Sequence, residues 1–149
     1  MLARILKGSR DKKLLEMKLD KSPVYGYYRN LTLAEITARI DRAIVDGYLE
    51  ITYNYRLPVL IYTETGWEIE KETYAEELLH KLRDLLPGGD YSYVQELKDR
   101  NRQMILLLLE KIEATGDRRF IPLLKVWAKI DCKKVKKAIN KVIAALQVE

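Results

Sequence analysis

A helix pattern that runs directly into two short strand patterns constrains the fold of this chain more than any other feature. Apolar side chains recur at helical spacing through residues 33–44, which gives the segment one apolar face. Thr32 stands at the N-cap position, and Glu35, three residues on, completes the pattern of a capping box. Gly47 follows the last periodic residue, as is typical of a helix end. We therefore predict a helix over residues 32–46.

Two strands joined by a tight turn are predicted to follow this helix. The first strand is predicted over residues 48–53, because residues 49–53 alternate apolar and polar side chains at the period of a half-buried strand, and residues 58–63 form the second strand pattern. Asn54 supplies a residue type that favours turns. A helix that leads into a short hairpin is typical of a winged helix. The predicted fold class is therefore mainly α with a small β-hairpin wing.

Two short helices are predicted before this segment. The first covers residues 2–6 and ends at Gly8, and Ser9 then stands where it would cap a second helix that extends to Leu19. Four cations fall on that second segment, namely Arg10, Lys12, Lys13 and Lys18. Free backbone N–H groups at a helix start, a hydroxyl and nearby cations together favour the binding of a phosphate group.

Composition excludes several classes of protein. The chain has 149 residues, 48% of them hydrophobic, which is enough for one ordinary core or two small ones. Neither a membrane-spanning segment nor a signal peptide is visible, so we expect a cytoplasmic protein. With a single cysteine, Cys132, and a single histidine, His80, we expect no disulfide and no metal site. No phosphate-binding Gly-rich loop and no nucleophile with a base stand out, so we expect neither enzyme nor cofactor.

The charge of the chain is concentrated at its two ends. Residues 1–30 hold eight Lys or Arg against three Asp or Glu, and residues 117–149 hold nine against three. Acidic residues outnumber basic ones in between, by eight to four over residues 31–75 and by eight to six over residues 76–116. This asymmetry favours a polyanionic partner, because clustered cations release counterions when they bind nucleic acid. A solvated lysine surface is the alternative interpretation.

Several short motifs resemble the RecQ C-terminal domain, usually written RQC. In chain order these are Ile5-Leu6-Lys7-Gly8-Ser9, Asp20 before Val24-Tyr25-Gly26, Ile44-Val45-Asp46-Gly47-Tyr48-Leu49, Leu57-Pro58-Val59-Leu60 and Thr63-Glu64-Thr65-Gly66. The resemblance covers roughly residues 4–70. It implies a winged helix that binds duplex or branched DNA, with helix starts and loops on the phosphates. In some members of this family the tip of the wing separates base pairs.

The candidate DNA-binding residues follow from these two lines of reasoning. Cations at helix starts and loops are expected to contact phosphates, while the wing tip is expected to stack on a base pair or an unpaired base. Tyrosines around Gly26 either stack on bases or line the core, and we expect at least one of them in the core. The candidates are Ser9, Arg10, Lys12, Lys13, Lys21, Tyr25, Arg29, Thr32, Tyr53, Tyr55 and Arg56.

The second half of the chain reads as helical throughout. An apolar stripe over residues 78–86 ends at Pro87-Gly88-Gly89-Asp90, and a long helix is predicted over residues 93–114. Residues 101–147 are similar to a HEAT repeat, which is a pair of antiparallel helices. The features that carry this similarity are Gly116-Asp117, Pro122 in the first helix and Asp131 before the second.

The last predicted helix carries a possible second basic face. Lys133, Lys137 and Lys141 recur every four residues, opposite an apolar stripe, and like charges at that spacing repel one another. An anionic partner would relieve this repulsion, although a solvated face has the same pattern.

We therefore predict two domains, a winged-helix DNA-binding domain over residues 1–75 and a helical HEAT-like segment over residues 76–149. The predicted function is that of a non-catalytic DNA-binding module. Two alternatives remain open. One is a scaffold whose helical half binds a protein partner, and the other is a winged-helix transcription regulator.

Overall fold

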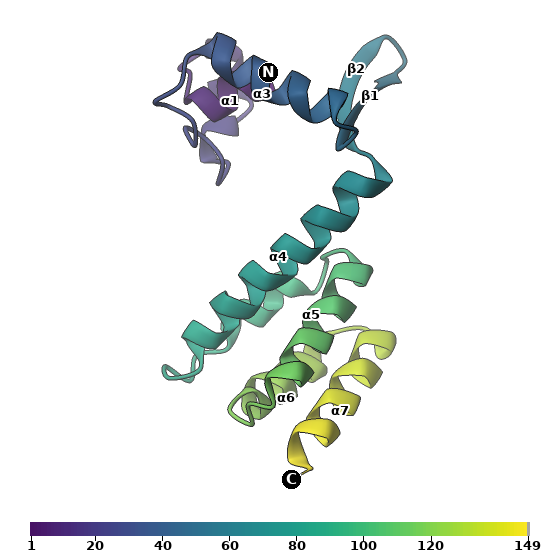
Figure 1. The fold of residues 1–149 in the computed structure, drawn as a ribbon. Coiled ribbons are helices and arrows are strands. Elements are labelled where there is room, and N and C mark those ends of the chain that lie inside the picture. The colour runs from purple at the N-terminus through teal and green to yellow at the C-terminus, as the bar shows by residue number, and fades with distance from the viewer. Residues whose placement is uncertain (149) are drawn as a thin grey trace. The chain divides into compact units, whose positions relative to one another are not determined.

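The computed structural model describes residues 1–148, and its contacts divide the chain into two compact units. The N-terminal unit is Met1–Trp67 and the C-terminal unit begins at Glu68 (Figure 1). The elements of the first are α1 (Leu2–Lys7), α2 (Lys12–Glu16), a short 3₁₀ helix (Leu19–Lys21), α3 (Leu33–Val45), β1 (Leu49–Asn54) and β2 (Leu57–Tyr62). Helix α4 (Glu64–Leu85) crosses the boundary and is followed by a 3₁₀ helix (Ser92–Leu97), α5 (Arg102–Thr115), α6 (Phe120–Ile130) and α7 (Lys133–Gln147).

Helix α3 and the hairpin confirm the predicted fold class. The Thr32 hydroxyl accepts a hydrogen bond from the Glu35 backbone at 3.1 Å, and the Glu35 carboxylate accepts one from the Thr32 backbone at 2.7 Å. This is the predicted capping box. Strands β1 and β2 then pair antiparallel, in a register that runs from Leu49 opposite Tyr62 to Asn54 opposite Leu57. The chain is mainly helical with one small wing.

The C-terminal end of α1 is held by the loop that precedes α3. The backbone N–H of Gly26 donates to the Ile5 carbonyl at 2.9 Å, and that of Tyr28 donates to the Leu6 carbonyl at 2.8 Å. Gly8, at φ 79°, ends α1, and a Cβ added to it would lie 3.1 Å from the Gly26 Cα. Gly8 therefore permits a close approach of two backbones, whereas a Cβ added to Gly26 would lie 2.6 Å from the Arg29 guanidinium.

The prediction that Ser9 caps a second helix is wrong. Helix α2 is only five residues long, and its N-cap is Asp11, whose carboxylate accepts from the backbones of Lys13 at 3.1 Å and Leu14 at 3.3 Å. A carboxylate is a stronger acceptor than a neutral hydroxyl and favours the positive end of a helix, so Asp11 takes this position. The segment does not extend to Leu19 as one helix, because a turn at residues 17–18 separates α2 from the 3₁₀ helix.

The prediction of a half-buried first strand is also wrong, because the hairpin is exposed on both faces. On one face, Ile51 is 51% exposed and Tyr53 69%, while Leu57 on the other face is 70% exposed. The described part of the chain places only these two strands in the sheet, so alternation along β1 has no covering layer to bury it. An open hollow of about 420 Å³ does lie between the start of α1 and the hairpin, with an apolar lining.

The C-terminal unit has the larger hydrophobic core. Buried side chains from α4, α5, α6 and α7 form one cluster, in which the largest are Trp127 and Phe120. The single long helix predicted over residues 93–114 is wrong, because a 3₁₀ helix and a turn occupy its first part. The Asn101 side chain accepts from the backbone of Gln103 at 2.9 Å and starts α5 there. An apolar stripe cannot reveal such a break, since Val94 and Leu97 are buried in the 3₁₀ helix as well.

An ion-pair cluster supplements this core on its surface. The Lys111 ammonium group on α5 bridges two α4 carboxylates, those of Glu72 and Glu76. The hydrogen bond from Lys111 lowers the pKa of the Glu76 carboxyl. The cations of α4 and α5 are thus partly neutralised within the unit.

The start of α4 is packed against the turn between α3 and β1. The Thr63 hydroxyl donates to the Gly47 carbonyl at 2.5 Å and accepts from the Gly66 backbone at 3.0 Å, so it serves as the cap of α4. A Cβ added to Gly66 would lie 1.9 Å from the carbonyl oxygen of Tyr48. Only glycine fits at this position without a backbone shift.

We predict that Gly66→Ala destabilises the N-terminal unit by about 1–3 kcal/mol, the usual cost of forcing an extra carbon into a packed site. Alanine would otherwise favour a helix, so a loss of stability identifies the contact with Tyr48 as the cause. Urea denaturation followed by circular dichroism measures the change. Gly88→Ala is the control, because the nearest atom to its new Cβ lies 3.8 Å away. Equal stability of both variants would contradict the prediction.

Candidate nucleic-acid interface

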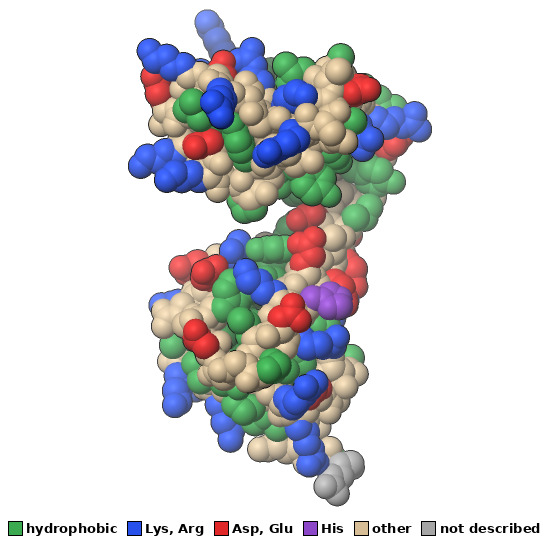
Figure 2. Space-filling view, turned by 90° about the vertical axis from the view of Figure 1, so that its left-hand side faces the viewer, with side chains coloured by type: hydrophobic (Ala, Val, Ile, Leu, Met, Phe, Trp, Pro, Cys, Tyr) green, Lys and Arg blue, Asp and Glu red, His purple; other side chains and the backbone are tan. Residues whose placement is uncertain are grey.

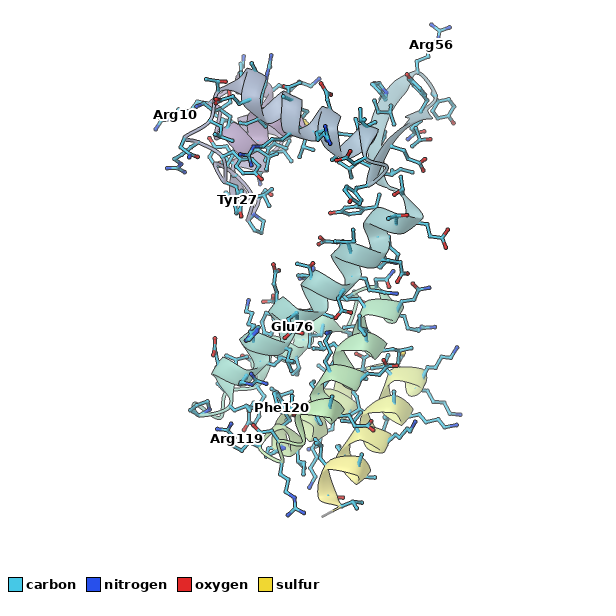
Figure 3. All side chains as sticks on the ribbon, viewed as in Figure 1. Arg10, Tyr27, Arg56, Glu76, Arg119 and Phe120 are labelled. Atoms are coloured by element: carbon cyan, nitrogen blue, oxygen red, sulfur yellow. The ribbon has the colours of Figure 1, made fainter. Side chains whose placement is uncertain are left out.

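The N-terminal unit presents a set of cations that the fold does not use. Arg10, Lys13 and Lys21 are exposed, and none of them makes an ion pair or a side-chain hydrogen bond within residues 1–148. Arg10 points away from the unit in Figure 3. Figure 2 shows Lys and Arg side chains spread over one face of this unit with few acidic ones between them. This surface can contact phosphate groups without first breaking internal bonds.

Two further predicted cations have weak internal partners. The Lys12 ammonium lies 3.8 Å from the Glu16 carboxylate, and its side chain is 91% exposed. The Arg29 Nε donates to the Gly26 carbonyl at 3.4 Å. An exposed ion pair of this kind contributes little to stability, so both side chains remain available to an external anion.

Ser9 and Tyr25 lie at the turn that follows α1. The Tyr25 hydroxyl lies 3.0 Å from the carbonyl oxygens of both Gly8 and Ser9, and its single proton is shared between them. Tyr25 is half-buried, whereas Tyr27 is 70% exposed and projects from the same loop (Figure 3). Three tyrosines close together in sequence carry no signal that separates these roles, and only the hydrogen bonds of the fold do so.

The start of α3 is less favourable for phosphate than its sequence indicates. The Thr32 hydroxyl and backbone are both engaged in the capping box, and the Glu35 carboxylate lies 2.7 Å from the Thr32 nitrogen. A carboxylate at this position already occupies the positive end of the helix and repels a second anion.

The wing tip is strongly exposed. Tyr55 is 98% exposed, Tyr53 is 69% exposed, and Arg56 stands at the end of the hairpin (Figure 3). Tyr55 has φ 57°, a left-handed conformation that a bulky residue rarely adopts. Leu57, which belongs to an RQC motif but is not among the candidate DNA-binding residues, is 70% exposed beside them. The sequence could have indicated this residue, because a large apolar side chain directly after the turn stands at the start of the second strand.

The two cations of α3 are both engaged by the fold. The Arg39 guanidinium lies over the Tyr28 ring, 5.0 Å from its centroid, and Arg42 pairs with Asp46 at 2.9 Å. The exposed surface of α3 therefore lacks the free cations that a helix in the major groove uses against the phosphates beside it.

Comparison with protein families decides the kind of module that these residues build. The family model of the RQC domain matches residues 1–81. The chain belongs to the RQC domain family. RQC domains are non-catalytic winged helices that typically bind DNA, which supports the general prediction of a DNA-binding module. Comparisons with curated proteins and with solved structures found no match.

The RQC match covers the whole N-terminal unit and the greater part of α4. Its motifs coincide with the contacts that hold this unit together, namely the approach of Gly8 to Gly26 and that of Gly66 to Tyr48. Within residues 1–148, no helix is long and apolar enough to cross a bilayer. Nor do acidic, histidine or cysteine side chains gather there in a group that would hold a metal ion.

The remaining predicted site residues lie in the C-terminal unit, outside the RQC match. Lys133, Lys137 and Lys141 are exposed on α7, and the buried side chains Val135 and Ile139 lie on the opposite side of that helix.

Lys7 shows that a cation in an RQC motif can have a structural role. Its ammonium group donates to the carbonyl oxygen of Arg29 at 2.8 Å and to that of Leu31 at 2.6 Å. The side chain therefore joins the end of α1 to the loop before α3.

We predict that Lys7→Met lowers the stability of the N-terminal unit, Met1–Trp67, which we call the RQC unit from here on. The expected loss is about 1 kcal/mol, since hydrogen bonds from a charged donor are lost at a partly exposed site. Lys13→Met is the matched control, because Lys13 is exposed and its ammonium group has no partner among the residues that the structure describes; the stability of this variant should change by less than about 0.5 kcal/mol. Thermal denaturation of both variants tests this. Equal melting temperatures would show that the two hydrogen bonds contribute nothing.

Proposed function

We propose that the RQC unit binds duplex or branched DNA through its phosphates and that its wing tip stacks on an exposed base pair or base. The observation that carries this proposal is Tyr55, which is 98% exposed in a left-handed conformation at the tip of the hairpin. The unpartnered cations of the same unit supply the phosphate contacts.

The proposed phosphate contacts are inferred from cations that have no strong partner inside the protein. Within the described residues 1–148, Arg10, Lys13 and Lys21 have no internal partner, while Lys12 and Arg29 have weak ones. Contacts to phosphate position a protein on DNA but carry no base sequence. This module is therefore a binder of DNA backbone and structure.

The conformation of Tyr55 supports a role for its side chain outside the fold. A two-residue hairpin turn with positive φ at its first residue favours glycine, and a tyrosine there costs of order 1 kcal/mol or more. An aromatic ring that is 98% exposed does not offset this cost by packing. A stacked base would, since such stacking contributes about 1–3 kcal/mol.

The alternative of a sequence-reading regulator receives less support. Base reading by α3 would require side chains that reach into the groove and cations that neutralise the phosphates beside it. Arg39 and Arg42 are held by Tyr28 and Asp46 instead.

The same proposal includes the wider organisation predicted from the sequence. We propose a DNA-binding domain over residues 1–75 and a helical segment over residues 76–149 whose helices α6 and α7 form a HEAT-like pair. A protein partner for this segment and a cytoplasmic location belong to the proposal as well. The packing of α6 against α7 around the buried Trp127 supports the HEAT-like comparison.

We predict that Tyr55→Gly weakens binding to forked DNA by about 5- to 150-fold, which corresponds to the loss of one stacked base. Glycine suits the left-handed turn, so the melting temperature should not fall. Tyr55→Phe retains the ring and should bind like the parent. Fluorescence anisotropy with labelled fork, blunt duplex and single strand measures these affinities. An unchanged fork affinity for Tyr55→Gly would refute the stacking role.

We predict that Arg10→Gln/Lys13→Gln reduces the slope of log affinity against log salt by about 1.8 on duplex DNA, at about 0.9 per phosphate contact. The matched control is Arg39→Gln/Arg42→Gln, which removes the same charge from side chains that the fold already engages. A larger effect of the control, especially one that depends on DNA sequence, would favour groove reading by α3.

A further inference from the structure

Helix α7 presents five lysines on one side, outside the residues that the RQC match covers. They are Lys133, Lys134, Lys136, Lys137 and Lys141, all of them exposed, and we call them the α7 lysine face. Successive residues of a helix are turned by about 100°. The five lysines then span about 160° of the helix circumference, centred opposite the buried stripe of Val135, Ile139, Val142 and Leu146.

No carboxylate of the described chain neutralises this face. From Phe120 to Gln147 the sequence has seven lysines and one acidic residue, Asp131. The Asp131 carboxylate is already engaged, because it accepts from the Trp127 ring nitrogen at 2.8 Å and from the Cys132 backbone at 2.7 Å. Within residues 1–148, none of the lysines of α7 forms an ion pair.

Several cations elsewhere in the same unit do form ion pairs. Lys71 pairs with Glu68 at 3.0 Å, and Lys111 bridges Glu72 and Glu76. Arg119 likewise pairs with Asp117, which raises the pKa of the arginine. Several cations of the same unit are thus neutralised by nearby carboxylates, whereas within residues 1–148 none of the five lysines of the α7 lysine face is.

The direction of α7 adds to the repulsion among its lysines. The first turn of the helix contains no acidic residue, and the Cys132 side chain does not cap it. Cations near a helix N-terminus are unfavourable, because the helix dipole is positive there. A bound anion would relieve both kinds of repulsion, and the lysines themselves supply the contacts.

The spacing of the lysines suits a nucleic-acid backbone. Lys133, Lys137 and Lys141 extend over about 12 Å along the helix axis, at about 1.5 Å per residue. One strand of duplex DNA places three to four phosphates in that length, at about 3.4 Å each. A membrane surface fits less well, because a helix that binds one also exposes an apolar face. No large hydrophobic side chain is exposed between Lys133 and Gln147 in this helix.

We propose that the α7 lysine face is a second binding site for a nucleic-acid backbone, independent of base sequence and separate from the RQC interface. The proposal rests on the proposed function, since the RQC unit supplies the reason to expect DNA as the partner. Two such sites on one chain raise its affinity for DNA that engages both.

The test compares three variants of the full chain with the parent in a salt series on labelled duplex. Lys133→Gln/Lys137→Gln/Lys141→Gln should reduce the slope of log affinity against log salt by about 2.7, at about 0.9 per contact. The matched control is Arg83→Gln/Lys98→Gln/Arg102→Gln, which removes the same charge from exposed positions of the same unit outside α6 and α7. The third variant is Arg10→Gln/Lys13→Gln. Glutamine is a good helix former, and circular dichroism checks that α7 is retained.

Each outcome separates this proposal from the function of the RQC unit. A reduced slope for the α7 variant alone supports the second site, even if Arg10→Gln/Lys13→Gln has no effect and the RQC grip is refuted. Equal slopes for the α7 variant and its control overturn the second site, while an effect of Arg10→Gln/Lys13→Gln then still supports the RQC interface. Polyglutamate and unlabelled duplex, added at equal charge, can also be compared as competitors of the labelled duplex. If polyglutamate displaces it more effectively, the face binds an acidic protein and the proposal is overturned. No salt-dependent binding by the parent would overturn both proposals.

Discussion

The approach of α4 to the turn after α3 is the contact on which the arrangement of the wing depends. The Tyr48 backbone donates to the Ala43 carbonyl at 2.9 Å and accepts from Thr63 at 3.1 Å, so one residue joins the end of α3 to the end of the hairpin. Gly66 permits this contact, because any side chain there would meet the Tyr48 carbonyl. With these bonds at its base, a two-stranded hairpin that is exposed on both faces has a defined position in its unit.

The role of each cation in this chain depends on what its side chain contacts. Lys7, Arg39, Arg42 and Lys111 are each held by backbone, aromatic or acidic partners and therefore serve the fold. Within residues 1–148, the cations without an ion pair include several around α2, Arg56 at the wing tip and the lysines of α7. An unpartnered cation loses only its hydration when it meets a phosphate, whereas a paired one must first exchange its partner. This difference explains why net charge alone does not locate an interface.

The two units also differ in the kinds of side chain that they bury and expose. The N-terminal unit has few fully buried side chains, chiefly Leu14 and Ile36, and it exposes large apolar and aromatic groups on the hairpin. The C-terminal unit buries its apolar stripes in one cluster and exposes lysines instead. The first unit thus offers aromatic rings together with charge, which suits contacts to bases as well as to phosphates. Within its described residues, the second exposes lysines and a few aliphatic side chains but no aromatic ring, which suits backbone contacts without base recognition.

Much of this protein is determined by sequence patterns that act over a few residues. Helical periodicity and the capping box located α3, strand alternation located the hairpin, and the motifs around Gly8, Gly26 and Gly66 led to the RQC family. The lysine stripe of α7 was equally visible, because its spacing is a local property. Such features depend on the period of a helix or strand and on the chemistry of single residues.

Only the tertiary structure decided which residue caps a helix, which face of a strand is covered and which tyrosine is held by hydrogen bonds. Asp11 replaced Ser9 as the cap of α2, Asn101 started α5 inside an unbroken apolar pattern, and no layer covered the hairpin that alternation predicted to be half-buried. The hydroxyl of Tyr25 is engaged at the end of α1, while Tyr27 faces solvent. Each outcome depends on which backbone or side chain lies within hydrogen-bond distance or packs on a face. For Tyr25 and the hairpin that proximity involves segments far apart in sequence, so no local pattern records it, whereas Asp11 and Asn101 cap residues only two or three positions on.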